Sequence, residues 1–378
     1  MSAFVKMPHA PTFEAETYEY KHYLPNYPVR DLEPHVELKM ADRGFNADPE
    51  MKAFLGAATK VTNLTACIGT EFEGIDLRQL SDKQKDEMAL FAAKRGVLVF
   101  RKQEISIEGM LDLARYWGPL HVHSTTGHPA KGPSDFALDA VVLVWNDGTK
   151  DVDRINHDRR LAWHSDQSFE INTPGLTSLK VITNPPEGGD TIWSNSAALL
   201  SSFSPELQEY LSKLSALHSS DRQKKGALDQ GIYIRRPQTD CIHPVVRVHP
   251  VTGMKALFVN PSYTRRIVGV PKAESDMILN FIYGQISLCE EFKVRVKWEK
   301  DSIVVWDNRV LWHTATYDIY PYKRHALRAT PVGERPMSVK QYIKQYGKEP
   351  TSWDEERLKK LGENPQAFLA TYKDPEPL

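Results

Sequence analysis

Two short segments that lie far apart in the sequence restrict the fold of this chain more than any other feature. The first, AWHSDQSFE, contains His164 and Asp166, and the second, WHTATYDIYPYKRHALRAT, contains His313, Arg324 and Arg328. In extended backbone, residues i and i+2 point to the same side, so His164 and Asp166 can reach one metal ion together. His313 must then come from another strand. The fold therefore has to bring the two segments together.

Two histidines and one carboxylate form the donor set that binds Fe(II) and leaves coordination positions open for a chelating co-substrate and O2. A His-x-Asp pair alone is a weak signal, and each histidine taken alone is better explained as an ordinary half-buried side chain. Arg324 strengthens the pattern, because an oxo-acid bound to the metal needs a cation at its far end. We therefore predict a metal site formed by His164, Asp166 and His313.

The sequence around the second segment is typical of β-structure. The runs KVRVKW and SIVVWD are rich in β-branched and aromatic residues and are joined by the polar turn at residues 299–301. Ligands that converge from different strands are characteristic of the open end of a barrel or jelly roll. The predicted fold is mainly β with flanking helices, around a double-stranded β-helix (jelly-roll) core.

Helices are predicted at three places outside these strands. LSDKQKDEMALFAAKRG has Ser81 as a possible N-cap and Gly96 at its end, and it leads into the strand VLVFR. Residues 106–117 and the segment SPELQEYLSKL also have helical spacing of apolar residues.

Three parts can be distinguished along the chain. Residues 1–60 are rich in proline, tyrosine and charge and are interpreted as an extended N-terminal arm with a short helix near residues 49–58. Residues 61–336 form the predicted catalytic domain. Residues 337–378 are charged, include the helical segment SWDEERLKKLG, and are interpreted as a C-terminal tail packed on the surface or on a neighbouring subunit.

Composition excludes several classes of function. The net charge of −1 offers no concentrated basic surface for nucleic acid. The longest apolar runs are far shorter than the roughly 20 residues needed to cross a bilayer, and the N-terminus has no apolar signal segment. Cys67, Cys241 and Cys289 are widely spaced and are interpreted as reduced, small buried side chains of a cytoplasmic protein. A homo-oligomer is expected.

Several further motifs occur in order from about Val61 to Pro336: VTNLTACIGTEFEGIDLRQLSDKQ, WGPLHVH, WHSDQSF, GGDTIW, HPVVRVHPVTGMKALFVN, VVWDNRVLWHTATYD and KRHALRAT. Together they resemble the taurine/sulfonate dioxygenase family of Fe(II)/2-oxoglutarate-dependent oxygenases, and its fungal members most closely. The resemblance implies Fe(II), 2-oxoglutarate as co-substrate and O2. It also implies that Arg324 holds the far carboxylate of 2-oxoglutarate, helped by Thr191 of GGDT. Without the resemblance, Thr191 would be interpreted as an ordinary strand hydroxyl.

The resemblance further implies a small anionic substrate. Arg328 corresponds to the arginine that binds the substrate's sulfonate, His123 of LHVH to a histidine that hydrogen-bonds the substrate, and Phe169 to a wall of the pocket. Arg160 lies four residues before His164 and is interpreted as an additional substrate-binding cation; a solvated loop charge is the alternative.

Three positions depart from the family pattern. Thr126 stands where a tyrosine is expected, Arg160 where an asparagine is expected, and Gln167 where an apolar residue is typical. These changes leave two enzymatic hypotheses open. The first is oxidation of a sulfonate such as taurine, which releases sulfite and an aldehyde. The second is hydroxylation, desaturation or ring closure of an amino acid or secondary-metabolite intermediate. A non-catalytic binding protein is disfavoured, because no metal ligand is missing.

Overall fold

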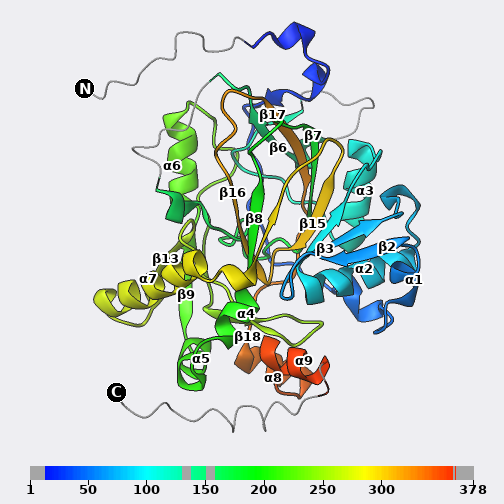
Figure 1. Cartoon of the computed structure of the whole chain (residues 1–378). Coiled ribbons are helices and arrows are strands. Elements are labelled where there is room, and N and C mark those ends of the chain that lie inside the picture. The colour runs from blue at the N-terminus through cyan, green and yellow to red at the C-terminus, as the bar shows by residue number, and fades with distance from the viewer. Residues whose placement is uncertain (1–12, 130–137, 150–157, 361, 363–378) are drawn as a thin grey trace.

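A computed structural model of the chain describes residues 13–129, 138–149, 158–360 and 362. This part is mainly β-structure with helices around it, as predicted (Figure 1). The largest sheet has seven strands in the order β2 (Lys60–Asn63), β3 (Thr70–Glu73), β4 (Val97–Phe100), β15 (Ile303–Asp307), β7 (Leu176–Thr183), β17 (Arg324–Ala329) and β6 (Val141–Asn146). Within it, β3 and β4 are parallel and the other neighbours are antiparallel.

Four smaller sheets complete the described β-structure. Their strand orders are β14 (Lys293–Val296), β8 (Thr191–Asn195), β16 (Leu311–Ala315); β10 (Asp240–Pro244), β9 (Ser215–Ser219), β13 (Thr264–Val268); β12 (Lys255–Leu257), β11 (Val246–Val248), β18 (Met337–Ser338); and β1 (Pro25–Asn26), β5 (His128–Pro129). The first of these, β14-β8-β16, carries His313.

The described α-helices are α1 (Lys52–Leu55), α2 (Asp82–Arg95), α3 (Ile107–Trp117), α4 (Ser196–Ser201), α5 (Pro205–Ser212), α6 (Asp221–Asp229), α7 (Lys272–Leu288), α8 (Val339–Tyr346) and α9 (Trp353–Lys360). The three helix predictions are confirmed by α2, α3 and α5. Ser81 forms a capping box at the start of α2, and Gly96 follows its end with φ of 74°, a backbone conformation that favours glycine.

The central strands β4, β15 and β7 of the seven-stranded sheet are buried on both faces, which explains the unbroken apolar runs VLVF in β4 and IVVW in β15. Side chains alternate along β4: Leu98 and Phe100 pack with α2 and α3, whereas Val97 and Val99 point to the opposite face. There they share one hydrophobic cluster with residues of β8, β14 and β16, such as Trp193. The seven-stranded sheet and the β14-β8-β16 sheet therefore face each other across a common core.

The two β-rich runs that flank the turn at residues 299–301 belong to different sheets. β14 pairs with β8, whereas β15 pairs with β4 and β7. Asp301 in the turn has a φ of 62°. The turn therefore carries the chain from one sheet to the facing one and does not close a hairpin.

The described part of the N-terminal arm lies along the catalytic core. Its backbone donates hydrogen bonds from Leu32 N to the Arg235 carbonyl (2.6 Å) and from Leu38 N to Asn172 Oδ1 (2.7 Å). At the other end of the chain, α8 and α9 pack on the chain's own core, with Tyr342 buried. The last residues of the predicted tail lie outside the described residues.

The three cysteines are free; Cys67 is buried in the core and the other two are half-buried. None of the helices in the described ranges has the length and apolar character needed to cross a membrane.

Candidate active site

The structure brings His164, Asp166 and His313 together. His313 lies in the middle of β16, and His164 forms a two-way backbone bridge with it: His164 N donates to the His313 carbonyl (3.1 Å), and His313 N donates to the His164 carbonyl (2.8 Å). This bridge places the two imidazole rings side by side, with centroids 4.2 Å apart. Asp166, two residues further along, points to the same side.

The donor atoms of these three residues all lie within 4.8 Å of one another. Asp166 Oδ1 is 3.6 Å from His164 Nε2 and 3.9 Å from His313 Nε2. Asp166 is fully buried, yet its second oxygen, Oδ2, has no hydrogen-bond partner among the described residues. A buried carboxylate oxygen without a partner is costly. The residues present therefore fit a metal ion bound between them.

Each ligand is held in a form that can bind a metal. His164 Nδ1 donates a hydrogen bond to the Ala162 carbonyl (2.7 Å), so Nε2, which faces Asp166, is the nitrogen available to a metal. Burial, with His164 and Arg328 nearby, lowers the pKa of His313 to about 3, so its ring is neutral. Burial raises the pKa of Asp166, but Arg328 and the neighbouring imidazoles outweigh this effect and hold the pKa below its usual range.

The backbone around Asp166 is fixed by Asn308. Asn308 Oδ1 accepts from Asp166 N (2.7 Å), and Asn308 Nδ2 donates to the Asp166 carbonyl (3.0 Å). The next residue, Gln167, is buried with a φ of 37°, and its Oε1 has no partner among the described residues. A non-glycine residue in this conformation is strained, and such strain is concentrated at functional sites.

Arg324 and Thr191 both lie beside Trp298. Thr191 Oγ1 accepts from Trp298 Nε1 (3.0 Å), and the Arg324 guanidinium lies 5.9 Å from the centre of the Trp298 ring. Thr191 pairs with Ala315 on β16, two residues after His313, so it lies on the same face of the sheet as His313. Burial lowers the pKa of Arg324 to about 10, against the opposing effect of Asp190, so the side chain stays charged.

Arg324 is a buried cation with unused hydrogen-bonding capacity. The side chain is 5% exposed, and its Nε has no hydrogen-bond partner among the described residues. A buried charge without a partner is unfavourable unless an anion binds it. The residues at this end of the site therefore fit a carboxylate ligand.

Arg328 lies four residues after Arg324 on β17 and on the same face of that strand. Its Nη1 donates to Asp166 Oδ1 (2.6 Å), while its Nε has no partner among the described residues. This guanidinium is therefore directly beside the proposed metal ligands.

His123 is buried close to the same group. Its Nδ1 accepts from the backbone N–H groups of Thr125 and Thr126, both at 3.1 Å. Burial, followed by the charges of His121 and Arg328, lowers the pKa of His123 well below its usual value. The ring is therefore neutral, and because Nδ1 accepts, Nε2 carries the proton and is a hydrogen-bond donor.

Two residues that the sequence did not single out complete this cluster. Tyr263 is buried with its ring centroid 5.0 Å from Phe169 and 6.1 Å from His164. The side-chain amide of Gln223, from α6, lies 3.3 Å from His123 Nε2 and 3.1 Å from the Tyr263 hydroxyl. Tyr263 follows the motif HPVVRVHPVTGMKALFVN closely, which is the signal that could have indicated it; no pattern in the sequence indicates Gln223.

The structure does not bring Arg160 into this cluster. Asp158 caps the short 3-10 helix at Arg159–Ala162, and its carboxylate binds the backbone N–H and the guanidinium of Arg160 (3.0 and 2.9 Å). The Arg160 side chain is 78% exposed. This arrangement corresponds to the solvated loop charge that was the alternative interpretation.

Comparison with known proteins yields one consistent result. The family model described as "Taurine catabolism dioxygenase TauD, TfdA family" matches residues 60–330. A putative alpha-ketoglutarate-dependent sulfonate dioxygenase of Schizosaccharomyces pombe is 38% identical over 319 residues, covering 84% of this chain and 81% of the relative. An alpha-ketoglutarate-dependent sulfonate dioxygenase of Saccharomyces cerevisiae is 35% identical over 348 residues, covering 89% and 83%. Alpha-ketoglutarate is 2-oxoglutarate.

Among solved structures, that of a putative alpha-ketoglutarate-dependent taurine dioxygenase from Burkholderia xenovorans has a TM-score of 0.63 and 31% sequence identity. The match covers 75% of this chain and 95% of the chain in the solved structure. The similarity therefore extends over most of the described core.

Proposed function

The chain belongs to the TauD/TfdA family of 2-oxoglutarate-dependent dioxygenases, and from this premise we propose that it oxidises a small sulfonate at a site built on His164, Asp166 and His313. It is an oxidoreductase that uses Fe(II), 2-oxoglutarate and O2. The observation that carries the site proposal is the convergence of these three donors beside Arg328, whose guanidinium has a free Nε. The facing sheets that position them are proposed to be the double-stranded β-helix of the family.

The bound iron with 2-oxoglutarate and O2 supplies an oxidant for an unactivated C–H bond, with succinate and CO2 as co-products. The chain's own residues bind and orient the reactants. Arg324 and Thr191 are proposed to hold the far carboxylate of 2-oxoglutarate, because a guanidinium can grip a carboxylate through two charge-assisted hydrogen bonds. Asn308 acts as a positioning residue, since it holds the backbone of Asp166 on both sides.

The substrate is proposed to lie between Arg328 and His123, with Phe169 and Tyr263 as apolar walls. The Arg328 guanidinium would bind the sulfonate, and His123 Nε2–H would donate a hydrogen bond to it. Anchoring one end of the substrate decides which C–H bond faces the iron. Hydroxylation of the carbon next to sulfur gives a product that loses sulfite as the C–S bond breaks and the hydroxyl becomes an aldehyde.

A second candidate substrate class is an amino acid. Gln167, the residue after Asp166, has a buried amide oxygen with no partner among the described residues. A free acceptor next to the metal ligands would suit a substrate that carries an ammonium group as well as an acid. This feature fits an amino acid, and it also fits an aminosulfonate such as taurine.

A substrate screen separates these candidates. Succinate release and sulfite release would be measured together for taurine, for alkylsulfonates without an amine, and for small amino acids. Sulfite release with taurine or an alkylsulfonate supports the sulfonate proposal. Stimulation of succinate release by an amino acid, with no sulfonate active, replaces it with the second candidate.

We expect Arg328→Ala to uncouple the reaction. Removal of the anchoring cation leaves the reactive carbon misplaced, so sulfonate oxidation should fall by about 100-fold while slow 2-oxoglutarate consumption continues. The measurement is the ratio of sulfite to succinate at saturating Fe(II), with the exposed Arg266→Ala as the matched control. An unchanged ratio in Arg328→Ala would assign the sulfonate to another residue.

The predictions of a cytoplasmic location and of a homo-oligomer remain predictions. Size-exclusion chromatography with light scattering tests the second.

A further inference from the structure

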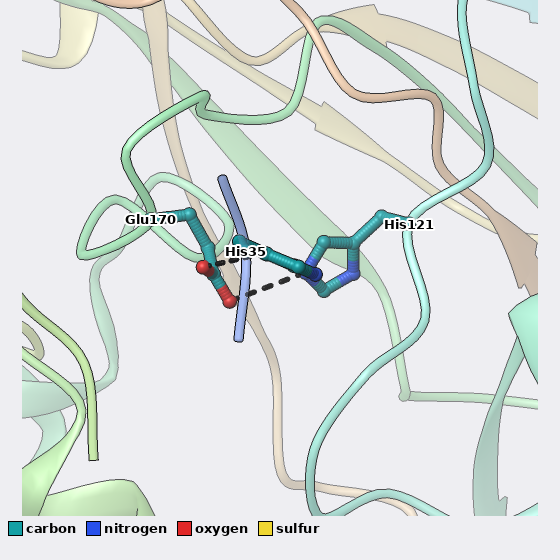
Figure 2. A group of neighbouring side chains, drawn as sticks. All are labelled: His35, His121 and Glu170. Carbon is teal, nitrogen blue, oxygen red and sulfur yellow. Dashed lines mark hydrogen bonds and ion pairs between the residues drawn. The ribbon is translucent and has the colours of Figure 1, made fainter. Parts of the chain in front are cut away.

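A second group of two histidines and one carboxylate lies outside the active site. Figure 2 shows His35 and His121 with their imidazole rings facing the carboxylate of Glu170. The three residues come from the N-terminal arm, from the segment before β5, and from the segment after Asp166. We propose that this group is a second divalent-cation site, with zinc as a cation that its donors fit, and that it fastens the arm to the catalytic core.

The geometry places one histidine at each oxygen of the carboxylate. His35 Nδ1 is 2.7 Å from Glu170 Oε2, and His121 Nε2 is 3.4 Å from Glu170 Oε1. All three donor groups lie within 4.8 Å of one another. Two imidazole nitrogens and one carboxylate match the His2Glu donor set that zinc takes in proteins. The side chains of His121 and Glu170 are each 2% exposed, whereas that of His35 is 24% exposed, so solvent can reach the site from the side of the arm.

The negative charge of the buried Glu170 carboxylate also favours a bound cation. In the described ranges, neither lysine nor arginine forms an ion pair with Glu170. The nearby Arg236 is bound elsewhere: its guanidinium donates to the carbonyls of Glu33 and Val122, both at 2.9 Å. A buried carboxylate is normally paired or coordinated to a metal. A divalent ion between the three donors would supply the missing positive charge.

The site is held in shape by contacts that do not depend on a metal. On the arm, the backbone hydrogen bonds of Leu32 and Leu38 fix the chain on both sides of His35. His121 N donates to the Thr330 carbonyl (2.8 Å). The Glu170 carbonyl lies 2.9 Å from His243 Nε2. Preorganised ligands lose little conformational freedom on binding, which favours a specific site.

A cation at this position would act on the substrate side of the enzyme. His121 is two residues from His123, and Glu170 directly follows Phe169. Binding would therefore link the arm to both segments that carry proposed substrate contacts. The inference rests on the cluster alone and not on the proposed substrate, because metal binding is measured without turnover.

The test counts zinc in a protein whose iron site has been removed. We expect the His164→Ala/Asp166→Ala variant to bind about one Zn2+ per chain in equilibrium dialysis followed by metal analysis. Adding His35→Ala should weaken Zn2+ binding by more than the roughly 10- to 100-fold that loss of an outer-shell partner costs. Adding His22→Ala, an exposed histidine of the same arm, should leave Zn2+ binding unchanged.

Two results would overturn the proposal. The first is an iron-site variant that binds no Zn2+, which would leave the cluster as hydrogen bonds alone. The second is Zn2+ binding that His35→Ala does not weaken. A zinc anomalous-scattering map of the iron-site variant with His35 intact gives an answer that does not depend on how His35→Ala folds: a peak between the three side chains supports the site, and its absence contradicts it.

Discussion

His164→Ala and Asp166→Ala should each reduce Fe(II)-dependent turnover of 2-oxoglutarate to the background of the assay. In the part of the chain that the structure describes, the site offers three protein donors, so the loss of one leaves too few to hold the metal in an open, reactive geometry. Because the site is catalytic and not structural, far-UV circular dichroism and the melting temperature should show that both variants remain folded. Succinate release at saturating Fe(II) is the measurement.

Matched controls for these variants are available on the surface. His22 and Asp112 are exposed, and their replacement by alanine should leave turnover unchanged. Substantial succinate release by either His164→Ala or Asp166→Ala would remove those residues from the iron site. The iron would then have to be bound by other histidines and carboxylates, such as the cluster around Glu170.

Replacement of Arg324 by alanine should weaken 2-oxoglutarate binding by about 2–5 kcal/mol, the typical cost of truncating one partner of a buried charge pair. The side chain is 5% exposed, and its Nε has no other partner among the described residues, so its removal would leave the carboxylate that it is proposed to bind unpaired in a buried site. The dissociation constant of 2-oxoglutarate, measured anaerobically in the presence of Fe(II), reports the effect.

Arg324→Lys refines this prediction. Lysine keeps the charge but loses the planar two-donor geometry, so it should restore part of the affinity and not all of it. Arg266→Ala serves as the exposed control. An unchanged affinity in Arg324→Ala would place the far carboxylate against a different cation.

The parts of the site that could be predicted from sequence depend on short-range geometry. His164 and Asp166 are two residues apart, and the prediction that their side chains lie on one side needs only the local geometry of extended backbone. The capped helix α2 could be predicted for a similar reason, since Ser81 and Gly96 act within a few residues of the helix ends. Local spacing carries this information without knowledge of the tertiary fold.

The parts that could not be predicted depend on contacts between distant segments. The turn at residues 299–301 is visible in the sequence, but whether it closes a hairpin or crosses between sheets depends on which strands lie beside β14 and β15. Gln223 approaches His123 only because α6 packs over that segment. Likewise, nothing in the sequence around His35 indicates that it meets Glu170.

Arg160 illustrates a different limit of prediction from sequence. Its position close to His164 suggested a role at the site, but distance along the chain does not fix side-chain direction outside regular extended structure. Asp158 caps the 3-10 helix at Arg159–Ala162 and binds the Arg160 guanidinium on the exposed side. A local side-chain interaction thus turns this cation toward solvent.

The most direct test of the iron-site assignment is a crystal structure of the protein with Fe(II) and 2-oxoglutarate, grown and frozen without oxygen. We expect the metal to be bound by His164 Nε2, a carboxylate oxygen of Asp166 and a ring nitrogen of His313, with the far carboxylate of 2-oxoglutarate against Arg324. Iron bound at other side chains, or 2-oxoglutarate with its far carboxylate away from Arg324, would contradict the assignment.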